Sequence, residues 1–78
     1  MPTVLRIGPY RLFFYSNEYG EPPHIHIQHE RALAKFWLSP LDLASSSGFP
    51  AHELSKLSKL VEEHNSELLE AWNEYFGN

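Results

Sequence analysis

The stretch at residues 21–29 reads Glu-Pro-Pro-His-Ile-His-Ile-Gln-His, a double proline followed by alternating histidine and isoleucine. Side chains on a β-strand alternate between the two faces of a sheet, so His24, His26 and Gln28 share one face. The two isoleucines share the other face, where they anchor the strand to a core. The pattern therefore predicts a strand at 24–30 with a core face and an imidazole face.

The flanking residues predict three further strands, at 3–7, 10–16 and 33–38, separated by residues that favour turns. Beyond the last of these, we expect a loop at 45–48, preceded by a short extended piece at 41–44. Because the strands follow one another closely in the sequence, they predict an antiparallel β-meander of about four strands.

Residues 51–76 predict helical structure, because apolar side chains recur there at spacings of three and four. Pro50 suits the first helical turn and Gly77 suits the stop. One continuous helix would be about 39 Å long, so two alternatives stay open: a single helix, or two segments with a kink near Asn65. The chain thus predicts one α+β domain over residues 1–78, with the meander packed on a long or kinked C-terminal α-helix.

Composition narrows the classes of protein that this chain can belong to. The chain has no cysteine, so disulfides and thiolate metal sites are excluded. Neither a signal peptide nor a run of about 20 apolar residues is evident, so we expect a cytoplasmic protein that is not inserted in a membrane. Residues 1–40 carry four cations against three carboxylates, whereas residues 41–78 carry two against seven. This asymmetry predicts two surfaces of unlike charge and disfavours non-specific coating of nucleic acid.

Placing the strands in register predicts that cations, imidazoles and aromatic rings gather on the sheet face away from the helix. The expected members of this face are Arg6, Arg11, Phe13, Tyr15, His24, His26, Lys35 and Trp37. Such a face could bind phosphate and stack bases. The alternative is a second small apolar layer that packs against a protein partner or a second copy of this chain.

The two strand histidines allow three kinds of chemistry. As metal ligands, His24 and His26 lie about 7 Å apart along the strand, but the suppliers of a third ligand lack diagnostic spacing; these are Glu21, Gln28, His52 and Glu53. As an acid–base pair with Lys35 or Arg11 nearby, the histidines would suit phosphodiester cleavage. In the third interpretation, the imidazoles pair with carboxylates or backbone and have a structural or partner-contact role. We expect no metal and no cofactor.

The remaining imidazoles are placed elsewhere by the same periodicity. His29 falls on the other face of the third strand, and His52 and His64 fall in the helical region. His64 lies on the apolar stripe, which predicts a half-buried packing residue.

Taken whole, the chain resembles a family of small prokaryotic proteins described as domain of unknown function four thousand one hundred and sixty. The resemblance runs from end to end and is carried by Arg6-Ile7-Gly8-Pro9-Tyr10-Arg11, Phe13-Phe14-Tyr15-Ser16, Glu21-Pro22-Pro23-His24-Ile25-His26-Ile27, Ala34-Lys35-Phe36-Trp37-Leu38, Leu43-Ala44 with Gly48-Phe49, and Leu68-Leu69-Glu70-Ala71-Trp72-Asn73-Glu74-Tyr75-Phe76. One departure is Pro50, where relatives commonly offer a serine-like helix cap.

The resemblance implies a biological context more than a reaction. Members are often encoded beside another small protein, which implies a type II toxin–antitoxin module with this kind of chain as the toxin and a small antitoxin-like protein as its partner. Two hypotheses follow. In the first, the toxin acts on RNA through His24, His26, Lys35 and Arg11. In the second, a non-enzymatic module binds protein or nucleic acid through Arg6 and the aromatic side chains of the sheet face, and a homodimer is one form that such a module can take.

Overall fold

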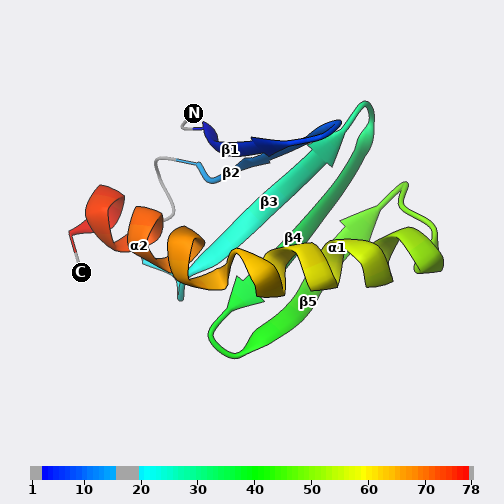
Figure 1. The fold of residues 1–78 in the computed structure, drawn as a ribbon. Helices are drawn as coiled ribbons and strands as arrows, with labels where there is room; N and C mark the ends of the chain where they lie inside the picture. Colours follow the sequence, from blue (N-terminus) through cyan, green and yellow to red (C-terminus); the bar gives the residue numbers. More distant parts are fainter. Residues whose placement is uncertain (1–2, 16–19, 78) are drawn as a thin grey trace.

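The computed structural model describes residues 3–15 and 20–77 and contains an antiparallel five-stranded sheet followed by two helices (Figure 1). The strands are β1 (Thr3–Ile7), β2 (Tyr10–Phe13), β3 (His24–His29), β4 (Ala32–Leu38) and β5 (Leu41–Ser47), and the helices are α1 (Ala51–Glu63) and α2 (Asn65–Phe76). The strands lie in the sheet in their order along the chain. The predicted α+β class with an antiparallel meander is therefore confirmed.

The expected number of strands is wrong by one, because β5 is a full strand rather than a short piece followed by a loop. Its three serines pair with β4, and Ser45 lies opposite Lys35. Serine-rich composition predicts a loop, but a long neighbouring strand offers a ladder of hydrogen bonds, and this tertiary pairing outweighs the local preference. An irregularity between Lys35 and Phe36 leaves Ala44 as an extra residue in β5.

The second strand ends earlier than predicted. β2 stops at Phe13, and Phe14 packs on Trp72, Tyr75 and Phe76 of α2, with ring centroids 5.2–5.4 Å away. Phe14 therefore contributes to the aromatic core of the helical layer. Ser16 and residues 17–19 of the predicted turn at 17–23 lie outside the described residues.

The helical region consists of two helices rather than one long helix. The break falls at His64, whose backbone (φ −106°, ψ 14°) has left the helical range, one residue before the predicted kink. Asn65 then donates a side-chain hydrogen bond of 2.9 Å to the carbonyl oxygen of Leu38 at the end of β4. Pro50 is the N-cap of α1, and Gly77 ends α2 in the left-handed conformation that glycine favours.

The core lies between the sheet and the two helices. Leu12, Ile25, Ile27 and Phe36 reach it from the sheet, and Trp72 is the largest side chain that the helices bury there. Within the described residues, neither helix has the length and apolar character needed to cross a membrane.

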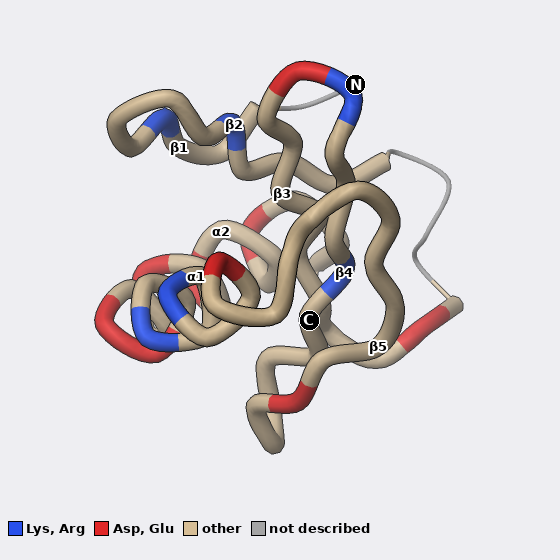
Figure 2. Tube along the Cα trace, turned by 90° about the vertical axis from the view of Figure 1, so that its right-hand side faces the viewer, with Lys and Arg blue, Asp and Glu red and all other residues tan. Residues whose placement is uncertain are grey.

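Charge is divided between the two layers, as Figure 2 shows. The helical layer carries most of the carboxylates, together with the two lysines of α1, whereas β1, β2 and β4 carry Arg6, Arg11 and Lys35. The strands therefore carry cations on the layer that faces away from most of the carboxylates.

Candidate functional site

The strand register places the predicted cations, imidazoles and rings together on the face of the sheet opposite the helices. Residues directly across from each other on neighbouring strands project from the same face. The relevant pairs are Arg6 with Arg11, Arg11 with Gln28, Phe13 with His26, His26 with Lys35, and His24 with Trp37. Tyr15 joins them just after β2, with its ring 4.9 Å from that of His26. We call this surface the sheet face.

The centre of the sheet face is a stack of three planar groups. The imidazole of His26 stacks on Phe13 at 5.3 Å and 25° between planes, and the guanidinium carbon of Arg11 lies 4.5 Å from the centroid of the Phe13 ring. Arg11 also donates hydrogen bonds to Thr3 Oγ1 (2.9 Å) and to Gln28 Oε1 (3.4 Å). The guanidinium is therefore held in one orientation over the ring, as a cation–π contact requires.

A second cation–aromatic pair lies beside this stack. The ammonium of Lys35 lies 4.5 Å from the centroid of the Trp37 ring and donates a 2.9 Å hydrogen bond to Glu21 Oε1. The same carboxylate oxygen lies 3.8 Å from Nδ1 of His24. Glu21 thus brings a negative charge to a surface that is otherwise cationic and aromatic at this point.

His24 links the sheet face to the helical layer. Its ring lies 5.1 Å from His26, 5.6 Å from Trp37 and 4.7 Å from Trp72 of α2. Its Nδ1 atom lies 3.0 Å from the carbonyl oxygen of Pro22, so a proton on Nδ1 would be donated to that oxygen. The double proline therefore supplies an acceptor that orients the imidazole at the start of β3.

Burial separates the members of the sheet face into two groups. His24 is 0% exposed and His26 is 8% exposed, whereas Tyr15 is 38% exposed. Trp37, Lys35 and Arg11 are partly exposed, and Arg6 is exposed. The imidazoles are thus packed as interior side chains, and the cations and two of the rings form the surface above them.

The geometry of the described residues offers no metal centre. Within 3–15 and 20–77, no group of three or more His, Asp or Glu side chains is placed to hold an ion. Of the four suggested third ligands, Glu21 is bound to Lys35, Gln28 contacts Arg11, and Glu53 accepts a hydrogen bond from Tyr10.

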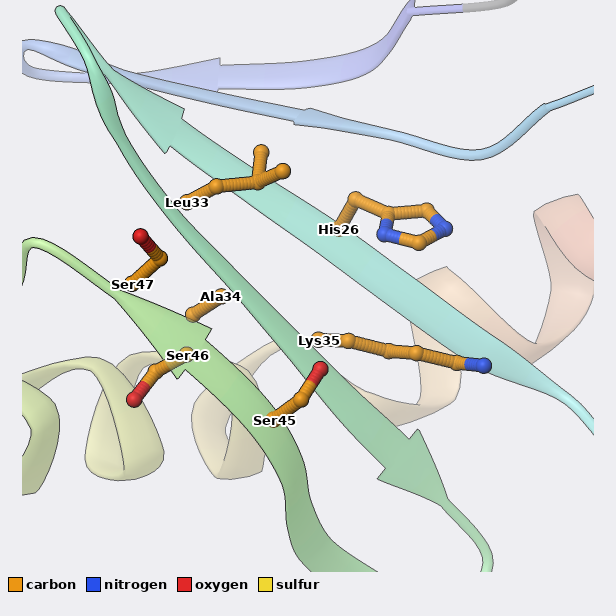
Figure 3. A pocket seen from close by; sticks show the side chains of 7 residues that line it. All are labelled: His26, Leu33, Ala34, Lys35, Ser45, Ser46 and Ser47. Atoms are coloured by element: carbon orange, nitrogen blue, oxygen red, sulfur yellow. The ribbon is translucent and has the colours of Figure 1, made fainter.

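A shallow hollow of about 320 Å³ lies between β3, β4 and β5. Figure 3 shows its lining, with the side chains of His26, Lys35 and Ser45 on the same side of the sheet. The remaining lining residues are Leu33, Ala34, Ser46 and Ser47. Hydroxyl, ammonium and imidazole groups are all hydrogen-bond donors, so this edge of the sheet face is suited to an anionic or hydrogen-bond-accepting ligand.

A separate polar cluster fastens α1 to the sheet on its helical side. The Tyr10 hydroxyl donates a 2.8 Å hydrogen bond to Glu53 Oε2, and His29 Nδ1 lies 3.8 Å from the same oxygen. Burial of Tyr10, followed by the hydrogen bond and the charge of Glu53, raises the pKa of the tyrosine hydroxyl. This cluster joins α1 to β2 and β3 and so has a structural role.

The sequence does not reveal the roles of two contributors to the site. Its pattern offers Glu21 only as a metal ligand and predicts a loop at Ser45. The partner of Glu21 is set by a contact with β4, fourteen residues away, which no local pattern reveals. Ser45 reaches the site only because β5 is a strand.

The fold and the site together define a small α+β protein with one helical layer and one uncovered sheet face rich in cation–aromatic contacts. This chain belongs to the family described as Domain of unknown function (DUF4160), whose model matches residues 10–73. That range contains seven of the eight predicted members of the sheet face and leaves out only Arg6. No curated protein and no solved structure matches the chain.

Proposed function

We propose that this chain is the partner-binding component of a two-protein module of the toxin–antitoxin type, and that the sheet face binds the small cognate protein. The observation that carries the proposal is the pair of cation–aromatic contacts, Arg11 on Phe13 and Lys35 on Trp37, above buried imidazoles. The two-protein context comes from the family resemblance.

Burial favours binding over acid–base catalysis. A general acid or base must come within hydrogen-bond reach of the substrate atom whose proton it transfers. His24 is fully buried, and His26 is covered on one side by Phe13 and contacted at its edge by Tyr15. His24 cannot meet a substrate without rearrangement of the rings around it, and His26 exposes only 8% of its surface, at the hollow that it shares with Lys35.

The exposed part of the face has the composition of a protein interface. Tryptophan, tyrosine and arginine dominate the binding energy of many protein complexes, and Trp37, Tyr15 and Arg11 lie here within one patch. Leu33 adds partly exposed apolar surface next to the hollow. A partner that presents an apolar side chain beside a carboxylate would complement both the rings and the cations.

Binding of the neighbouring gene product tests this proposal. We expect the protein encoded beside this chain to form a stable complex with it in isothermal titration calorimetry. Trp37→Ala removes a large partly exposed ring and should weaken the complex at least about tenfold, as expected for a central aromatic anchor.

RNA cleavage by a toxin is the second candidate, with His24 and His26 as acid and base and with Lys35 and Arg11 as stabilising cations. It is favoured by the 5.1 Å between the two imidazole rings and by the hollow beside His26 and Lys35. If it is correct, the purified chain cleaves an oligoribonucleotide, and a folded His26→Asn variant does so at least about a hundredfold more slowly. Intact RNA after prolonged incubation with the wild-type chain would exclude this candidate.

A further inference from the structure

Lys35 is the centre of a cluster of donors whose present acceptor belongs to the chain itself. Its ammonium nitrogen donates to Glu21 Oε1 at 2.9 Å and lies 4.5 Å from the centroid of the Trp37 ring. Lys35 of β4 lies directly across from His26 of β3 on one side and from Ser45 of β5 on the other. Figure 3 shows these three side chains on the same side of the sheet, at the hollow of about 320 Å³.

The ion pair between Glu21 and Lys35 is of a kind that a competing anion can replace. The Glu21 side chain is 44% exposed and that of Lys35 is 21% exposed, so water and salt reach the contact. Exposed ion pairs are weak and are screened by solvent. The lysine side chain has a flexible stem of four carbons, so the ammonium can turn toward the serines without movement of the backbone.

Glu21 occupies the hydrogen-bonding position beside the Lys35 ammonium while its backbone is held at the start of β3. It immediately precedes the two prolines that lead into β3, and its carboxylate also approaches Nδ1 of His24 at 3.8 Å. A carboxylate at this point neutralises Lys35 without filling the hollow beside it. An external anion could therefore take over the contact with Lys35 and gain hydroxyl donors that Glu21 does not touch.

We propose that Lys35, with Ser45 and His26, forms an anion-binding site and that Glu21 is its internal competitor. The ligand class is a carboxylate or phosphate group carried by the binding partner. This inference rests on the proposed binding role of the sheet face and adds to it the chemistry that the partner must present: an anionic oxygen group placed beside Trp37.

Titration of the full chain with inorganic phosphate, and separately with acetate, tests the site by nuclear magnetic resonance. We expect saturable shifts of the Lys35, Ser45 and Trp37 signals with at least one anion. The better anion indicates whether the partner supplies a phosphate or a carboxylate. Glu21→Gln removes the competitor. It should lower the midpoint, the anion concentration at half-saturation, about two- to fivefold, as expected for loss of an exposed ion pair. Lys35→Gln should abolish the shifts.

Glu30→Gln is the matched control, because Glu30 is an exposed carboxylate that lies beside His29, away from the hollow. Its midpoint should equal that of the wild-type chain. Equal midpoints for the wild-type chain and Glu21→Gln would overturn the inference, as would shifts at Lys56 and Lys59 as large as those at Lys35. Because no partner protein is present, failure of the anion site and failure of the complex are separate results.

Discussion

The histidines of β3 illustrate how position in a fold decides the chemistry of a residue. His24 and His26 lie on the sheet face with Lys35, as strand alternation predicts, yet they are the most buried of its polar members. Aromatic side chains of the neighbouring strands β2 and β4 and of α2 enclose them. Alternation assigns a residue to a face, but it does not indicate how deeply neighbouring side chains cover that face.

Tyr10 gives a prediction for the pH dependence of stability. Its pKa is raised in the folded chain above the ordinary value of about 10, so the folded state keeps the phenolic proton to higher pH than the unfolded chain. The resulting stability is fully present below about pH 10 and is lost as the pH rises through the folded pKa. In urea unfolding between about pH 8 and about pH 11, the wild-type chain should therefore lose more free energy of unfolding than Tyr10→Phe.

The ionisable groups other than Tyr10 are present in both proteins and cancel in the comparison. A Tyr10→Phe variant that loses stability as steeply as the wild-type chain would show that the contact with Glu53 does not favour the protonated hydroxyl.

At the scale of elements, the sequence predicted the regular parts of the fold and missed those that depend on pairing. β3 and the helical region follow clear periods of two and about 3.6 residues, and both are found close to their predicted bounds. β5 carries no such signal after Leu43, and its serines become a strand only because β4 offers a partner. A kink near Asn65 was one of two alternatives that the sequence left open. The observed break at His64 lies next to the hydrogen bond from Asn65 to the carbonyl oxygen of Leu38.

The connection from β5 to α1 depends on Gly48. Its φ is +88°, and an added Cβ would lie 3.1 Å from Cα of Ala32. Both the left-handed backbone and the close approach disfavour any side chain. We expect Gly48→Ala to lower the free energy of unfolding by about 1–3 kcal/mol in urea denaturation.

Gly20→Ala serves as the comparison, because no atom beyond its two chain neighbours is found within 4 Å of the position that its Cβ would take. Its free energy of unfolding should change by less than about 0.5 kcal/mol. Similar losses in the two variants would mean that the turn at Gly48 tolerates a side chain and that the packing on Ala32 is not tight.

At the scale of the whole molecule, the helical layer and the sheet differ in charge and in the surface that they expose. The helices bury one side of the sheet and carry most of the carboxylates, so they close the core and face solvent. The other side keeps three cations and two partly exposed rings on strands whose register is fixed by the core residues. The sequence predicted the members of this face, but their mutual contacts and the role of Glu21 required the three-dimensional arrangement.

The most direct test of the central claim, that the sheet face is a binding surface, compares a partly exposed ring of that face with an exposed ring of α2. Both are measured in the calorimetric titration with the proposed partner, the product of a neighbouring gene. Trp37→Ala should weaken the complex at least about tenfold. Tyr75→Ala, which removes a 49% exposed ring from α2, should leave it unchanged within about twofold. Unchanged binding by Trp37→Ala together with a loss in Tyr75→Ala would contradict the account and place the interface on the helical layer.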